Sequence, residues 1–179
     1  RGKSTLLKLL TGLYEPSEGS VLVDGHRIRR LGLRSFREKI GVVMQDDQLL
    51  SGTIAENVSF FDAQIDLPAI EAVCRLAHVH DDIMRLPMGY HSLIGDMGSA
   101  LSGGQKQRLI LARALYKKPA ILFMDEGTAN LDPALEARVI SSLASLGITR
   151  VMVAHRAAAV RGADRIILVE RGKVSEITE

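Results

Sequence analysis

The pentapeptide Leu101-Ser102-Gly103-Gly104-Gln105, followed further along the chain by the run Ala120-Ile121-Leu122-Phe123-Met124-Asp125-Glu126, decides the fold of this sequence. Serine is a residue type that caps helices, and the glycines after it leave backbone N–H groups open to an anion. The apolar run predicts a buried strand that presents two carboxylates at its carboxyl end. The pentapeptide alone also fits a serine-glycine loop before an ordinary helix, but the acidic strand beside it favours an anion site.

Composition places the chain among ordinary globular domains. Its 179 residues suffice for one domain, and 46% hydrophobic with 25% charged residues is typical of a soluble protein. The net charge of +2 gives no reason to expect nucleic-acid binding. A basic cluster with no interleaved aromatic residues predicts a solvated face. Its members are Arg27, Arg29, Arg30, Arg34 and Arg37.

Cysteine usage and hydropathy exclude further classes. Cys74 is the only cysteine, so an internal disulfide is impossible, and its place in an apolar helical pattern predicts a small buried side chain. The four histidines outside the motifs below (His26, His78, His80 and His91) are predicted to be surface or packing residues. No apolar stretch reaches the roughly 18 residues that span a bilayer, and no signal peptide is visible. We therefore expect a cytosolic segment that does not itself insert into a membrane.

The hydrophobic periodicity alternates between strands and helices. It predicts helices over 4–13, 53–58, 67–78, 103–117 and 133–146, and strands over 19–25, 40–45, 120–125, 150–154 and 165–169. Such alternation indicates an α/β fold, with a mostly parallel sheet flanked by helices. We expect residues 1–45 and 118–179 to form an α/β core, with 46–117 as an inserted helical subdomain.

The first residues match the end of a phosphate-binding loop. Arg1-Gly2-Lys3-Ser4-Thr5 corresponds to the last positions of G-x-x-x-x-G-K-[ST], in which lysine reaches the phosphates and serine reaches Mg²⁺. Together with the pentapeptide and the acidic strand, in this order, the motifs resemble Walker A, signature and Walker B of ATP-binding cassette (ABC) ATPases, which have a P-loop NTPase fold. The resemblance covers essentially the whole chain. It indicates a fragment that begins inside Walker A, and we expect it not to bind ATP normally.

The resemblance implies a site for ATP and Mg²⁺. Gln45 would be the Q-loop glutamine, Glu126 the general base, and His155 a contact of the γ-phosphate. Asp132 lies in the D-loop sequence Ala129-Asn130-Leu131-Asp132, and Gly95-Asp96-Met97-Gly98 takes the place of the exporter X-loop. The predicted catalytic residues are Glu126, His155 and Gln45; the ATP-binding residues are Gly2, Lys3, Ser4, Thr5, Ser102, Gly103, Gly104, Gln105 and Asp132; and the metal-binding residues are Ser4, Gln45 and Asp125.

Two departures from the family pattern lie between Walker B and the D-loop. Gly127 stands where alanine is usual, and Asn130 replaces serine or histidine. Either change would loosen this loop without removing a catalytic group.

The segment after Gln45 is similar to ABC exporters. Gln45 and the residues after it, 46–58, match Q-D-x-x-L-x-x-G-[ST]-I-x-[ED]-N-[IV], which in that family forms the groove for the coupling helix of the membrane domain. Residues 60–62, 80–83 and 86–90 are most similar to bacteriocin and colicin V-type peptide exporters. Protein-toxin (type I) and lipid exporters share much of this pattern. The resemblance implies a second ABC domain and a transmembrane domain as partners, at the cytoplasmic face of the inner membrane.

Two other classes of protein are alternatives to this interpretation. ABC ATPases of DNA repair or chromosome organisation commonly carry a long coiled coil between the lysine loop and the acidic strand, and this sequence has no heptad run between Lys3 and Asp125. A regulatory module without activity is disfavoured for the parent protein, because both Glu126 and His155 are present. For a chain that lacks most of Walker A, however, catalytic inactivity remains an alternative.

Overall fold

The computed structural model describes residues 2–95, 101–128, 130–153, 163–170 and 172–177. The helices are α1 (Lys3–Leu10), α2 (Ile28–Leu31), α3 (Leu33–Arg37), α4 (Ile54–Ser59), α5 (Leu67–Leu76), α6 (His80–Met84), the 3₁₀ turn η1 (Gly89–His91), α7 (Gly103–Tyr116) and α8 (Pro133–Ala144). The strands are β1 (Leu22–Val23), β2 (His26–Arg27), β3 (Ile40–Val43), β4 (Gly52–Thr53), β5 (Leu93–Ile94), β6 (Ile121–Asp125), β7 (Thr149–Val153), β8 (Ile166–Glu170) and β9 (Lys173–Ile177).

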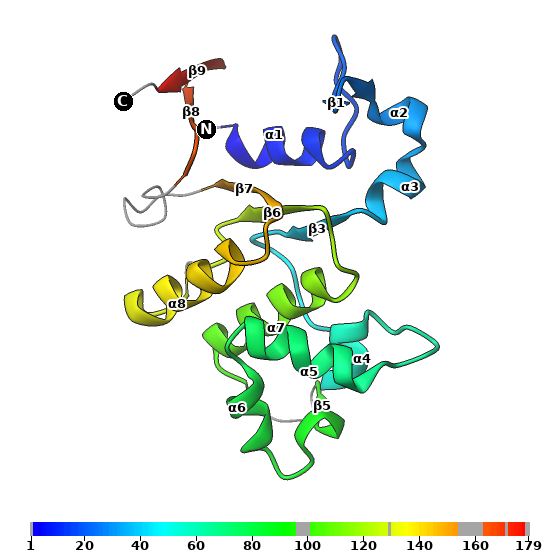
Figure 1. Cartoon of the computed structure of the whole chain (residues 1–179), viewed down its shortest axis with the longest axis vertical. Coiled ribbons are helices and arrows are strands. Elements are labelled where there is room, and N and C mark those ends of the chain that lie inside the picture. Colours follow the sequence, from blue (N-terminus) through cyan, green and yellow to red (C-terminus); the bar gives the residue numbers. More distant parts are fainter. Residues whose placement is uncertain (1, 96–100, 129, 154–162, 171, 178–179) are drawn as a thin grey trace.

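A parallel sheet in the order β3-β6-β7 forms the centre of the fold. Val43 lies opposite Met124, and Asp125 lies opposite Val153, so the three strands end at one edge. Figure 1 shows α1 on one face of this sheet and α7 with α8 on the other. The predicted α/β architecture is therefore confirmed.

Helix α7 connects the sheet to the helical group α4–α6, which lies beyond it in Figure 1. It packs against α4, α5 and β3. Four of its apolar side chains are almost completely buried: Leu109, Leu111, Ala112 and Leu115. Burying such side chains contributes roughly 1.5–3 kcal/mol for each large one, so α7 holds the two parts of the chain in one core.

The remaining strand pairs are antiparallel and lie outside this sheet. β1 and β2 form a hairpin in which Asp24 and Gly25 both have positive φ, as a two-residue turn with the twist of the strands requires. The alternating pattern predicted 165–169 as a further strand of the parallel sheet. The structure places β8 in an antiparallel pair with β9 instead, because the chain reverses near Gly172 (φ 76°).

Several smaller predictions are confirmed. Cys74 is fully buried, and burial raises the pKa of its thiol to about 12, so it is inert at neutral pH. His80 packs in the interior with Nδ1 2.8 Å from the Tyr90 hydroxyl, whereas His26 and His91 are exposed. In the arginine cluster, Arg29 pairs with Glu15, and both side chains are mostly exposed.

The close packing of α7 against β3 requires glycine at position 41. A Cβ at this position would lie 2.6 Å from the carbonyl oxygen of Ala114 in α7. We predict that Gly41→Ala lowers the free energy of unfolding by about 2 kcal/mol through overpacking, as measured by urea denaturation. The exposed Ser17→Ala is the control, with an expected change below about 0.5 kcal/mol. A Gly41→Ala variant as stable as the control would contradict the close contact between α7 and β3.

Candidate functional site

The predicted cap at the start of α7 is present as a reciprocal pair of hydrogen bonds. The backbone N–H of Gln105 donates to the Ser102 hydroxyl (3.2 Å), and the Ser102 N–H donates to Gln105 Oε1 (2.9 Å). Ser102 and Gly103 are exposed, and no atom lies within 4 Å of a Cβ built on Gly103. Ser102 and Gly103 are therefore open to solvent, at the positive end of a 14-residue helix.

The carboxyl edge of the sheet gathers three predicted residues. Asp125 ends β6 and is only 4% exposed, while Glu126 follows it with a φ of 52°. Left-handed backbone costs a bulky residue roughly 1–2 kcal/mol and persists only where the surroundings enforce it. Gln45 lies two residues beyond the end of β3, in a turn closed by hydrogen bonds between Met44 and Asp47, and is exposed.

The end of the phosphate loop lies at the start of α1. Gly2 occupies the cap position with a φ of 101°, and Lys3, Ser4 and Thr5 form the first turn. Helix α1 packs against β6, and Figure 1 shows that it begins on the side where the parallel strands end. Lysine, backbone N–H groups and the helix dipole thus lie on the same side as Asp125 and Glu126, which suits the binding of phosphates.

The oxygen donors at this edge fit Mg²⁺ better than a transition metal. No group of three or more His, Cys, Asp or Glu side chains that could hold a metal occurs among the described residues. Mg²⁺ usually takes one or two carboxylates and completes its shell with phosphates and waters. The buried carboxylate of Asp125 at the end of β6, with Ser4 at the start of α1, which packs against β6, is consistent with that mode of binding.

Gly127, Thr128 and Asp132 are held by contacts within the chain. Asp132 caps α8 by accepting hydrogen bonds from the N–H groups of Ala134 (3.1 Å) and Leu135 (3.0 Å). Thr128 donates to Glu136 in the interior (2.6 Å). A Cβ on Gly127 would lie 2.8 Å from Met124 Cε and 3.2 Å from Val43 Cγ1. The expected loosening at Gly127 is therefore wrong, because glycine allows close packing there.

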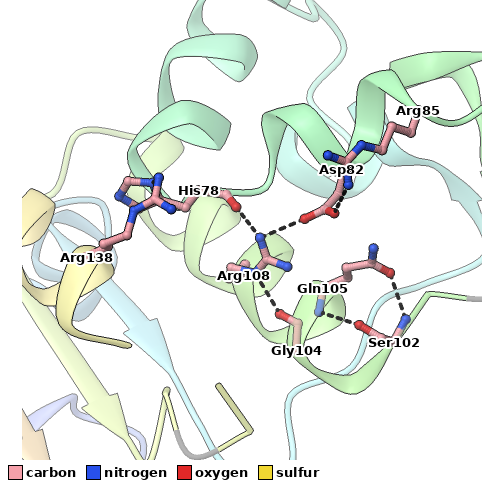
Figure 2. Close-up of polar contacts among 8 residues, drawn as sticks. All are labelled: His78, Asp82, Arg85, Ser102, Gly104, Gln105, Arg108 and Arg138. Carbon is pink, nitrogen blue, oxygen red and sulfur yellow. Dashed lines mark hydrogen bonds and ion pairs between the residues drawn. The ribbon is translucent and has the colours of Figure 1, made fainter. Parts of the chain in front are cut away.

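Two residues next to the pentapeptide have contacts that their sequence positions did not reveal. Gln107 bonds to the backbone of Glu126 and Asn130 on one side. Arg108, with a side chain only 9% exposed, turns to the other side and pairs with Asp82 (2.8 Å). Its guanidinium also donates to the carbonyl oxygens of His78 and Gly104 (Figure 2). In the sequence, the adjacent polar residues Gln107 and Arg108 are the signal that could have predicted polar contacts from this helix to neighbouring segments.

His78 extends this cluster to α8. Its Nε2 lies 2.8 Å from the Ser142 hydroxyl, and its Nδ1 lies 3.3 Å from Arg138 Nη2. Arginine only donates, so Nδ1 acts as the acceptor and Nε2 carries the proton of a neutral imidazole. The contacts drawn in Figure 2 therefore connect the first turn of α7 with both α6 and α8.

The segment that resembles the exporter groove is built around Asn57. This side chain is 1% exposed; it accepts from the Leu50 N–H (2.7 Å) and donates to the carbonyls of Leu50 (2.8 Å) and Thr53 (3.0 Å). Thr53 and Glu56 form a capping box at the start of α4, and the Thr53 backbone N–H holds the pKa of Glu56 below its usual value. These residues fix the path of the chain after Gln45.

A pocket of about 430 Å³ opens beside this segment. Its lining comes from the residues just after α1, from β3, from the residue that follows α4 and from α7. Phe60 is 61% exposed, and the Arg113 guanidinium lies 5.4 Å from its ring centre. Partial burial lowers the pKa of Arg113, and Asp47 opposes this shift. The lining includes Thr11, Arg37, Met44, Asp47, Phe60, Arg113 and Lys117.

Some predicted positions lie outside the described residues. They are His155, Ala129 of the D-loop sequence, and the segment 96–100, which includes Asp96 to Gly98 of the X-loop sequence. Across the described residues, no helix is both long and apolar enough to cross a membrane.

The family model for "ABC transporter" matches residues 1–129. This chain belongs to the ABC transporter family. Its motifs and its P-loop NTPase fold are those of the nucleotide-binding domains of that family. The ATP-bound structure of a bacterial Atm1-family ABC exporter superposes with a TM-score of 0.90 at 36% identity, covering 98% of this chain and 31% of that one.

Curated relatives point in the same direction. The chain is 51% identical to a probable microcin-H47 secretion/processing ATP-binding protein of Escherichia coli over 94% of its own length. It is 49% identical over 94% of its length to the colicin V secretion/processing ATP-binding protein of the same organism. A leukotoxin translocation ATP-binding protein of Mannheimia haemolytica is 41% identical over 98% of this chain. The chain spans about a quarter of these relatives, at 24%, 24% and 25% of their lengths.

The Arg108–Asp82 pair yields a stability prediction. We predict that Arg108→Met lowers the free energy of unfolding by about 3 kcal/mol, because it removes the donor to two carbonyl groups and leaves Asp82 with only the more distant, exposed Arg85, as measured by urea denaturation. Arg85, whose side chain is 79% exposed and lies 3.8 Å from the same carboxylate, provides the matched control. Arg85→Met should change stability by less than about 0.5 kcal/mol. If the two variants lowered the free energy of unfolding equally, the stabilising role of the buried Arg108 contacts would be refuted.

Proposed function

We propose that this chain forms the ATP-binding domain of an ABC exporter, and that it binds and hydrolyses ATP to power export of a peptide such as a bacteriocin. The exposed, capped first turn of α7 is the observation that carries this proposal. It presents N–H groups to an anion, yet α7 lies across the sheet from the phosphate-binding start of α1 (Figure 1). A single chain therefore offers two separate phosphate-binding surfaces.

Two copies that face each other would complete both surfaces. Gly2, Lys3, Ser4 and Thr5 of one copy would hold the phosphates of ATP, while Ser102, Gly103, Gly104 and Gln105 of the second copy would contact the γ-phosphate. Asp132 would approach the nucleotide from the D-loop between the copies. The 36% identity to an exporter solved with ATP bound supports this arrangement.

The sheet edge would supply the chemistry of hydrolysis. Ser4, Gln45 and Asp125 would hold Mg²⁺, which neutralises the charge that develops on the phosphates. Glu126 would accept the proton of the attacking water, and His155 would contact the γ-phosphate. The buried position of Asp125 supports its assignment, since a buried carboxylate requires a cation or hydrogen-bond partners.

The domain division follows from the same arrangement. We propose that residues 1–45 and 118–179 form the nucleotide-binding core and that 46–117 form the helical subdomain that carries the signature. The pocket beside Phe60 is lined from both parts, so a coupling helix of the membrane domain that enters it would sense their relative positions. This places the chain at the cytoplasmic face of the inner membrane. A protein-toxin exporter is the second candidate, favoured by the 41% identity to the leukotoxin relative.

Replacement of the proposed general base tests the enzymatic function. We predict that Glu126→Gln in the full-length protein lowers the rate of ATP hydrolysis by about 10²–10⁴, the usual contribution of a general base. Phosphate release measures this rate. Glu38→Gln, which alters an exposed carboxylate beside Arg34 (3.5 Å), should hydrolyse ATP at the normal rate. Near-normal turnover of Glu126→Gln would refute the assignment.

The exposed aromatic side chain beside the pocket tests the exporter assignment. We predict that Phe60→Ala weakens docking of the membrane domain about thirtyfold, as expected for the loss of an aromatic anchor worth about 2 kcal/mol. Transport in vesicles should fall, while ATP binding by the full-length protein stays unchanged. Ile65→Ala, at an exposed apolar residue outside the pocket lining, is the control. Equal transport by both variants would contradict a docking role for Phe60.

A further inference from the structure

Gln107 uses both ends of its side-chain amide on the loop after β6. Its Nε2 donates to the carbonyl oxygen of Glu126 (2.9 Å), and its Oε1 accepts from the backbone N–H of Asn130 (3.0 Å). Both partners are backbone groups, so the contact fixes the path of the chain whatever side chains stand at 126 and 130. A single residue of α7 thus spans the loop from Walker B to the D-loop.

The backbone at Glu126 needs such a contact. Its φ of 52° is in the left-handed region, which a long side chain adopts only where neighbouring groups enforce it. One constraint is the buried Gly127, which fits closely against Met124 and Val43. The hydrogen bond from Gln107 to the Glu126 carbonyl is a second constraint, and it acts on the peptide group between these two residues.

The first turn of α7 packs on the same loop. A Cβ at Gly104 would lie 3.3 Å from the Asn130 carbonyl oxygen and 3.4 Å from a Leu131 methyl group. Gln107 follows on the next turn of the same helix. Glu126, Asn130 and Leu131 are therefore held against α7 by two successive turns, and Gln107 supplies the polar contact.

We propose that Gln107 is a positioning residue for hydrolysis: it holds Glu126 in its left-handed conformation and so fixes where the carboxylate meets the attacking water. This rests on the proposed function of Glu126 as the general base. A displacement of about 1 Å at a reacting group can lower a rate by about 10². Loss of the Gln107 contact should therefore lower kcat while leaving ATP binding at Lys3 and Ser4 intact.

Two variants of the full-length protein separate the hydrogen bonds. Gln107→Glu keeps an acceptor for the Asn130 N–H but loses the donor to Glu126, whereas Gln107→Leu removes both. We expect each to lower kcat about 10–100-fold, with KM for ATP within about threefold of the normal value. Gln64→Leu, at an exposed glutamine, is the control and should leave both constants unchanged. A normal kcat in Gln107→Glu, or a loss confined to KM, would overturn the proposal.

Combination with Glu126→Gln distinguishes positioning from a general loss of structure. If Gln107 acts through the Glu126 carboxylate, Gln107→Glu should lower the residual rate of Glu126→Gln by less than about threefold, because the group being positioned is already gone. A full 10–100-fold further loss in the double variant would overturn the proposal. Near-normal hydrolysis by Glu126→Gln alone would instead refute the proposed function, so the two failures are distinguishable.

Discussion

The burial of α7 between the sheet and the helical group is the constraint on which the rest of this structure depends. Its apolar side chains fill the core, and the close approach of the Ala114 carbonyl requires glycine at position 41 of β3. This fixed packing determines where the first turn of the helix lies. The hydrogen bonds between Ser102 and Gln105 then leave the remaining N–H groups of that turn open to a ligand.

Much of this arrangement was predictable because it follows from local patterns. The run 120–124 is uniformly apolar because β6 lies between two strands of a covered sheet, and Asp125 marks its end. Ser102 and Asp132 cap α7 and α8 as their residue types suggest. Parallel strands end at one edge, which explains why motifs far apart in sequence lie near one another.

The contacts between elements could not be predicted in the same way. Periodicity identifies which face of α7 is apolar, but it does not say which backbone groups Gln107 and Arg108 reach. The sequence alone predicts that Gly127 loosens its loop, because the packing of Met124 against this residue is visible only in the fold. The antiparallel pair of β8 and β9 depends on a local reversal of the chain at Gly172. The alternation of strands and helices along the sequence does not predict such a reversal.

Gln107 and Arg108 together restrict the orientation of α7 about its own axis. Successive residues on an α-helix point about 100° apart, and these two side chains bond to different neighbours, the loop after β6 and helix α6. Rotation of α7 in either direction would stretch one of these links, and sliding along the axis would stretch both. Hydrogen bonds add a directional constraint to this packing, because they weaken steeply when their angle departs from linearity. The polar pair therefore adds to the buried leucines in fixing the angle at which the capped first turn lies.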